Sequence, residues 1–187
     1  MHILTILGSP RKKGNTAAVL GAFEALAAAR HTIERIHITD YHVQGCLGCD
    51  VCQHTPDAPG CKQKDDALII LERMMAADLV VYASPLYVWD VTAQLKALMD
   101  RHYCLVKWNA GESRSLVAGK PVMLLITCGG GVENNADLVQ EIFRREMEYA
   151  GCRVVGLYIV PDCTTPQALG ERAGKTAQEM LVSLEGW

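Results

Sequence analysis

The sequence lacks the features that mark several large classes of protein. It has no excess of positive charge, because 18 lysines and arginines stand against 21 aspartates and glutamates and give a formal net charge of -3. Nucleic-acid-binding proteins are usually basic, so we expect no nucleic-acid partner. No stretch approaches the roughly 18 to 20 consecutive apolar residues that span a bilayer, so we also expect no membrane partner. The composition, 50% apolar and 21% charged, is that of a globular domain and excludes disordered, collagen-like and coiled-coil chains.

A recognisable targeting segment is also missing at the N-terminus. The sequence begins M-H-I-L-T-I-L-G-S-P-R, where the apolar stretch is too short for a secretory signal and the charges follow it rather than precede it. We therefore expect a cytoplasmic protein. In that compartment a tight group of cysteines binds metal or acts in redox chemistry more often than it forms a disulfide framework.

The length of 187 residues fits a single domain, 1–187, and the chain alternates between strand and helix patterns five times. The predicted strands are 2–7, 32–38, 79–83, 122–126 and 154–160, and the predicted helices are 15–30, 65–75, 91–99, 138–147 and 166–184. Several strands are almost continuously apolar, which indicates that both faces of the sheet are covered. The order predicts a parallel α/β sheet with right-handed crossovers. Two segments interrupt it, a cysteine-rich loop at 44–64 and a polar, glycine-containing surface insertion at 104–119.

The loop after the first predicted strand has the composition of a phosphate-binding loop. Residues 8–16 read G-S-P-R-K-K-G-N-T and join a strand to a helix N-terminus, where free N–H groups and the helix dipole favour an anion. Ser9, Asn15 and Thr16 add short hydrogen-bonding side chains, Arg11 adds positive charge, and two glycines allow close backbone approach. The loop matches neither the P-loop nor the G-x-G-x-x-G dinucleotide loop. The alternative is an ordinary turn in which Asn15 and Thr16 cap the helix.

Two further strand ends carry unusual residues. Residues 84–90 read S-P-L-Y-V-W-D, and the flat side chains of Tyr87 and Trp89 suit a planar ring system, although ordinary packing is the alternative. Residues 127–131 read T-C-G-G-G, whose unobstructed N–H groups suit a ring edge that bears carbonyl oxygens, although a glycine cluster is commonly just a turn. Ligands of open α/β sheets bind at the carboxyl ends of the strands, near the point where the strand order reverses. We therefore expect the three loops to surround one ligand.

Together these loops resemble those of the flavodoxin-like NAD(P)H-dependent FMN reductases. G-S-P-R-K-K-G-N-T is similar to their FMN-phosphate loop, and P-L-Y-V-W-D-V-T-A-Q-L-K-A-L-M-D-R resembles their proline–tyrosine loop and the helix that follows. The resemblance extends over nearly the whole chain. It implies a flavodoxin-like, doubly wound, five-stranded parallel sheet of strand order 2-1-3-4-5, a bound FMN, and a homodimer with the flavin near the interface.

The resemblance also implies which residues contact FMN. The phosphate would be held by Ser9, Arg11, Asn15 and Thr16. The isoalloxazine ring would be bordered by Pro85, Leu86, Tyr87 and Trp89, and its other edge would be covered by Thr127, Gly129 and Gly130. Relatives often place an aromatic residue and then glycine after the tyrosine, whereas this chain has Val88 and Trp89. Which of these side chains touches the flavin is therefore left open.

Eight cysteines are present, and four of them follow the spacing C-x2-C-x2-C-x8-C, namely Cys46, Cys49, Cys52 and Cys61. Such spacing lets one short loop reach three corners of a cubane, with a more distant thiolate as fourth ligand, and so favours a [4Fe-4S] cluster. Structural zinc more often uses two separated C-x2-C pairs. The motif resembles that of the iron–sulfur flavoproteins, a branch of the same family in which the last spacing is usually shorter.

The alternative is a loop without a cluster. Many FMN reductase relatives keep cysteines in a loop that serves only as a lid near the flavin, and Cys46 and Cys49 would then be redox-active thiols. We expect His54 in this loop to be solvated rather than a ligand. The other four cysteines are scattered and are interpreted as small buried apolar residues, namely Cys104, Cys128, Cys152 and Cys163.

Three functions are compared on these grounds. The leading one is an FMN-dependent oxidoreductase in which NAD(P)H gives hydride to the flavin and electrons pass to a small-molecule or protein acceptor. Because the cofactor carries this chemistry, no dedicated catalytic acid or base is expected from the protein. The second is an electron-transfer protein in which a [4Fe-4S] cluster takes electrons from a ferredoxin-like donor and relays them to FMN. The third is a regulatory or structural module without a cofactor.

Overall fold

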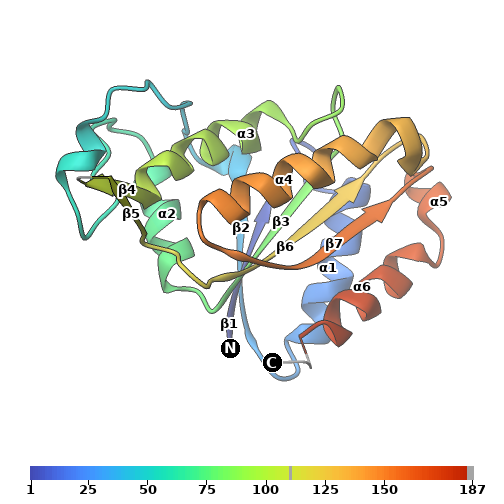
Figure 1. Ribbon diagram of the computed structural model, residues 1–187. Helices are drawn as coiled ribbons and strands as arrows, with labels where there is room; N and C mark the ends of the chain where they lie inside the picture. The colour runs from blue at the N-terminus through green and yellow to red at the C-terminus, as the bar shows by residue number, and fades with distance from the viewer. Residues whose placement is uncertain (110, 185–187) are drawn as a thin grey trace.

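The computed structural model describes residues 1–109 and 111–184, and a parallel five-stranded sheet forms its centre (Figure 1). The strands are β1 (His2–Leu7), β2 (Thr32–His37), β3 (Leu79–Pro85), β6 (Pro121–Thr127) and β7 (Arg153–Val160). They lie in the order β2-β1-β3-β6-β7, and each neighbouring pair runs parallel. Counted along the chain this is the order 2-1-3-4-5, so the predicted flavodoxin-like sheet is confirmed.

Helices cover both faces of the sheet. They are α1 (Asn15–Ala27), α2 (Ala67–Ala76), α3 (Ala93–Asp100), α4 (Asp137–Tyr149), α5 (Pro166–Leu169) and α6 (Arg172–Val182). One core lies between the sheet and α1 with α6, and the other between the sheet and α2, α3 and α4. Every residue of β3 is buried, because helices pack against both of its faces. No helix in the described part of the chain is long and apolar enough to cross a membrane.

The bounds of the five predicted helices are each shifted in the structure, and three of the differences are notable. The helix expected at 15–30 ends at Ala27, and the one expected at 65–75 begins only at Ala67. The last predicted helix, 166–184, is divided into α5 and α6 by Gly170, whose φ of 50° and ψ of -136° do not fit a helix.

The predicted insertion at 104–119 contains a hairpin of β4 (Val106–Asn109) and β5 (Glu112–Ser115). This hairpin lies beside the cysteine-rich loop at the left of Figure 1. Gln53 joins the two segments, because its side-chain amide donates to the Val106 carbonyl at 3.0 Å and accepts from the Trp108 N–H at 3.0 Å. The hairpin therefore packs against the loop that carries the four clustered cysteines.

Candidate functional site

The three loops singled out in the sequence meet at one edge of the sheet, because β1, β3 and β6 are neighbours. The Gly8 N–H donates to the Ala83 carbonyl at 2.7 Å, which joins the first loop to β3. The Leu86 N–H donates to the Thr127 carbonyl at 2.9 Å, and the hydroxyls of Thr16 and Thr127 are 2.6 Å apart. Hydrogen bonds thus connect all three loops, and the sequence-based expectation that they are adjacent is confirmed.

The N-terminus of α1 is open to a ligand. The residue before the helix is Gly14, and within the described residues no side chain caps the helix and no acidic residue stands in its first turn. The first-turn N–H groups are therefore available to an anion. Ser9 shapes the loop by accepting the Arg11 N–H at 3.1 Å, and a Cβ built on Gly14 would lie 3.8 Å from the Arg11 Nε. The exposed Arg11 side chain thus lies beside the helix N-terminus.

The alternative interpretation of this loop, an ordinary turn, requires Asn15 to cap the helix. Asn15 does not do so. Its side-chain nitrogen donates to the Cys163 carbonyl, and its Oδ1 is buried without a partner among the described residues. Buried polar atoms are almost always hydrogen-bonded in native proteins. The free oxygen of Asn15 therefore has the capacity to accept a hydrogen bond from a bound molecule.

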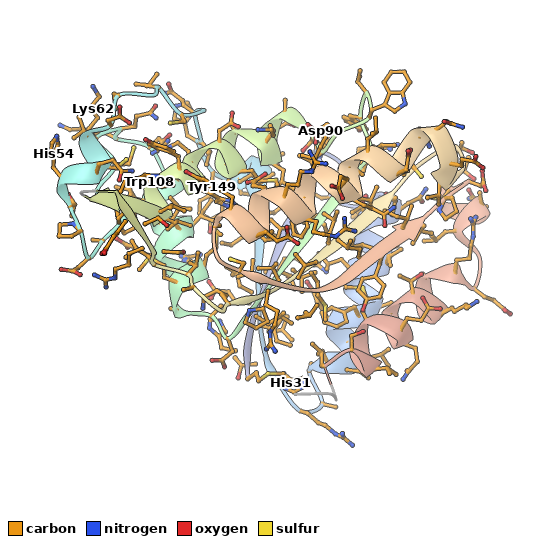
Figure 2. The ribbon with its side chains drawn as sticks, viewed as in Figure 1. His31, His54, Lys62, Asp90, Trp108 and Tyr149 are labelled. Carbon is orange, nitrogen blue, oxygen red and sulfur yellow. The ribbon has the colours of Figure 1, made fainter. Side chains whose placement is uncertain are left out.

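Residues 87–90 form a tight turn that exposes two aromatic side chains. Tyr87 and Asp90 exchange backbone hydrogen bonds of 2.8 and 3.1 Å, and Asp90 lies at the upper edge of the molecule (Figure 2). The two residues at the tip, Val88 and Trp89, have φ angles of 50° and 65°. This left-handed conformation is costly for a β-branched residue, and such strain is commonly found at functional sites. Tyr87, Val88 and Trp89 are all exposed.

The third loop presents backbone rather than side chains. Thr127 is buried and holds the first two loops, whereas Gly129 and Gly130 are exposed. A Cβ on Gly130 would lie only 3.1 Å from the side-chain nitrogen of Asn135, so a larger residue would displace that neighbour. The Cys128 side chain turns inward, and its Sγ donates to the Gly130 carbonyl at 3.2 Å.

A buried ion pair holds both ends of the cysteine-rich loop. Arg101 Nη1 donates to Asp65 Oδ2 at 2.7 Å and to the Gln44 carbonyl at 3.0 Å, and the Gln44 N–H donates to Asp65 at 2.9 Å. Both charged side chains are only 1% exposed. Burial by itself would raise the pKa of Asp65, but the hydrogen bonds from Arg101 and Gln44 outweigh it and the pKa is lowered. Residue 44, where the loop begins, and residue 65, just after it, are thus fixed to the same guanidinium group.

A second buried cation holds the middle of the loop. The Lys107 ammonium donates to the Cys52 carbonyl at 2.9 Å and to the Pro59 carbonyl at 3.1 Å. Its side chain comes from β4 and is buried, and this burial lowers the pKa of Lys107. Two cations and one carboxylate therefore lie together in this part of the protein, which leaves an excess of buried positive charge.

The four clustered cysteines line one small cavity inside this loop. Its walls include Cys46, Cys49, Cys52 and Cys61, together with Arg101 and Cys104. Within the described residues, no three His, Cys, Asp or Glu side chains are arranged as ligands of a metal ion. The structure thus gathers the predicted thiols without placing them in a ligand geometry. His54 is exposed, as expected, at the outer edge of the loop (Figure 2).

Cys104 is a buried core residue, as its sequence interpretation expects, and it also lines the cysteine cavity. Burial raises the pKa of the Cys104 thiol to about 12. Cys128 and Cys163 are buried and Cys152 is partly buried, in agreement with their interpretation as ordinary packed residues.

Sequence reasoning missed the residues that hold these loops in place. Thr92 caps α3 by accepting the Leu95 N–H and donates its hydroxyl to the Gly8 carbonyl at 2.6 Å. A threonine directly before the apolar pattern of a helix is a recognised N-cap signal, so the sequence could have predicted that Thr92 caps α3. Arg101 and Lys107 carried no comparable signal, because a single cation in a mixed sequence is usually exposed.

The solved structures that resemble this chain confirm the class of fold. One is the NAD(P)H:quinone oxidoreductase from Methanothermobacter marburgensis, with a TM-score of 0.70, 20% identity and 96% of each chain covered. At this identity the similarity defines a flavodoxin-like α/β protein and nothing more specific.

The family follows from the sequence comparisons. The model of the NADPH-dependent FMN reductase family matches residues 1–159, so the chain belongs to this family. It is 37% identical over 157 residues to an iron-sulfur flavoprotein of Methanosarcina thermophila, covering 83% of this chain and 78% of that protein. It is also 38% identical over 101 residues to an iron-sulfur flavoprotein of Archaeoglobus fulgidus, covering 54% of this chain. That match spans only 48% of the Archaeoglobus protein.

The strained turn leads to a prediction about stability. Replacing Val88 by Asn should raise the free energy of unfolding by about 1 kcal/mol, because asparagine tolerates the left-handed conformation far better than valine. Val88 is 86% exposed, so little apolar contact is lost. Urea denaturation measures the change, and Val182→Asn on exposed helix α6 is the control, with an expected change within about 0.5 kcal/mol. Equal free energies for the Val88 variant and the unmodified protein would contradict the assignment of strain to this turn.

Proposed function

We propose that this protein is an FMN-dependent oxidoreductase that takes electrons from NAD(P)H and passes them to a small-molecule or protein acceptor. The observation that carries the proposal is the uncapped N-terminus of α1 beside the buried, unpaired Asn15 Oδ1, at the edge where all three loops meet. Membership of the NADPH-dependent FMN reductase family supports the same conclusion.

The residues at this edge fit the chemical parts of FMN. The α1 N–H groups and Arg11 suit the doubly charged phosphate, with Ser9 shaping the loop. Asn15 Oδ1 suits a hydroxyl donor of the ribityl chain, because it can only accept a hydrogen bond. Exposed Tyr87 and Trp89 suit a planar ring, and the N–H groups of the glycine-rich third loop suit its carbonyl oxygens.

The protein's own part in the reaction is to bind and orient. When bound, FMN supplies the two-electron redox chemistry of its isoalloxazine ring. Arg11 and the α1 dipole would offset the phosphate charge, and the N–H groups of the third loop would stabilise negative charge on the ring. The strained turn at Val88 and Trp89 holds Tyr87 at the ring side of the site.

The phosphate loop is tested by the double variant Asn15→Ala/Thr16→Ala. We expect the dissociation constant for FMN to rise about 10- to 100-fold, because side chains that contact or position the ligand are removed. Flavin fluorescence titration of the apoprotein measures the change. Thr32→Ala, on the exposed edge strand β2, is the control and should bind FMN normally. Unchanged affinity in the double variant would show that the loop does not hold the cofactor.

The electron donor is tested by anaerobic reduction of the FMN-loaded protein. We expect NADH or NADPH to bleach the flavin absorbance in stopped-flow measurements, with added quinone or another acceptor restoring it. A protein that neither nucleotide reduces, but that a low-potential ferredoxin reduces rapidly, would instead be an electron-transfer protein. An apoprotein that takes up no FMN at all would favour a module without a cofactor.

We further propose that the cysteine-rich loop holds a [4Fe-4S] cluster with Cys46, Cys49, Cys52 and Cys61 as ligands. Two observations support this second role. The four thiols line one cavity, and buried Arg101 and Lys107 leave an excess of positive charge that suits an anionic group. Relatives of this chain are named iron-sulfur flavoproteins, which agrees with the proposal.

Metal analysis tests the cluster. Protein purified or reconstituted without oxygen should contain about four iron and four acid-labile sulfide per chain, as the cluster formula requires. Cys52→Ala should lose most of both, whereas Cys152→Ala, at a partly buried cysteine outside the cavity, should keep them. Iron and sulfide near zero in the unmodified protein after such reconstitution would rule the cluster out while leaving the FMN site intact.

A homodimer is also proposed. Leu138, Ile142 and Tyr149 are exposed along α4, and Trp108 from the hairpin donates its indole N–H to the Tyr149 hydroxyl at 3.2 Å. Trp108 and Tyr149 lie side by side where the hairpin meets α4 (Figure 2). Such a row of apolar side chains on one helix face is typical of a protein interface.

A further inference from the structure

A buried guanidinium group with unused hydrogen-bond donors is rare, and Arg101 is one. Its side chain is 1% exposed, and one nitrogen, Nη1, makes the bonds to Asp65 and Gln44 that hold the ends of the cysteine-rich loop. The other two nitrogens, Nε and Nη2, are buried and find no partner among the described residues. They carry three of the five N–H groups of the side chain. The hydrogen bonds that fix the loop therefore use only the nitrogen that carries two of the five N–H groups of Arg101.

These donors belong to a side chain that borders the cysteine cavity. Arg101 lines that cavity together with Cys46, Cys49, Cys52 and Cys61. The neighbouring buried cation, Lys107, is different, because its ammonium group donates to two backbone carbonyls of the loop. Arg101 is thus the residue that brings both a positive charge and free N–H groups to the thiols.

We propose that Arg101 donates these N–H groups to sulfur of the iron–sulfur cluster and thereby raises the reduction potential of that cluster. The inference rests on the proposed cluster. A [4Fe-4S] core with four thiolates carries a net charge of -2 when oxidised and -3 after it accepts one electron. A fixed cation and N–H donors stabilise the more negative form more strongly, so Arg101 favours reduction.

This role is separable from the role of Arg101 in fixing the loop. In Arg101→Lys a single ammonium group keeps the charge and the partner for Asp65, but the planar, forked donors are lost. The double variant Arg101→Met/Asp65→Asn removes both charges without leaving an unpaired buried carboxylate. Arg114→Lys is the matched control, because Arg114 pairs with Asp57 of the same loop at 2.7 Å but both side chains are largely exposed.

The test is a potentiometric titration of the reconstituted full-length protein, followed by electron paramagnetic resonance of the reduced cluster. We expect the order of potentials to be unmodified protein, then Arg101→Lys, then the double variant, which is lowest. The equilibrium constant for one-electron reduction should fall at least tenfold in the double variant, which is about 59 mV. Arg114→Lys should match the unmodified protein. Iron content and thermal unfolding are measured on each sample, because a purely structural role would change these without ordering the potentials.

The outcomes separate this inference from the function on which it rests. Unmodified protein that takes up no iron and sulfide overturns the cluster and this role of Arg101 together. A loaded cluster whose potential is the same in all four proteins overturns the role of Arg101 and leaves the cluster standing. Folded Arg101→Lys that binds FMN normally but no longer retains iron also overturns the role in setting the potential, because Arg101 would then serve to hold the cluster in place.

Discussion

The parallel pairing of β1, β3 and β6 is the constraint on which the rest of this structure depends. Parallel strands that are neighbours end at the same edge of the sheet, so residues 8–16, 84–90 and 127–131 must meet there. The strand order reverses between β1 and β3, which opens the space in which open α/β sheets bind ligands. Short bonds among the loops, such as the 2.6 Å contact between Thr16 and Thr127, then fix their relative positions.

The cysteine-rich loop is organised by charge rather than by a hydrophobic core of its own. Arg101 and Asp65 hold its ends, and Lys107 holds its middle through the carbonyls of Cys52 and Pro59. Burying charged groups is unfavourable unless they are paired and hydrogen-bonded, and here the pairing is incomplete on the side of the cavity. Both cations come from the segment directly after α3, so the helix that follows the aromatic turn also positions the cysteine loop. The edge where the three loops meet and the cysteine cavity are therefore connected through one structural element.

Two locally unfavourable features lie at these sites. Val88 and Trp89 adopt left-handed backbone angles that the rest of the described chain largely avoids outside glycine, and Asn15 keeps a buried oxygen without a partner. Features of this kind are retained where the surrounding structure enforces them and a bound group benefits from them. Their positions, on two of the three loops at the sheet edge, agree with a ligand site at that edge.

The sequence by itself determined the fold and the sheet edge at which the three loops meet. Near-continuous apolar strands alternating with helix patterns dictate a parallel sheet with two covered faces, and the glycine-rich and polar loops fall at the strand ends. The cysteine spacing likewise marked the loop at 44–64. Only the tertiary structure decided what surrounds those cysteines. Arg101 and Lys107 lie about 40 to 60 residues further along the chain, as the numbering shows, and no local pattern distinguishes them from exposed cations. Arg101 is held by Gln44 and Asp65, and Lys107 by the carbonyls of Cys52 and Pro59. These are long-range contacts, which periodicity and spacing do not encode.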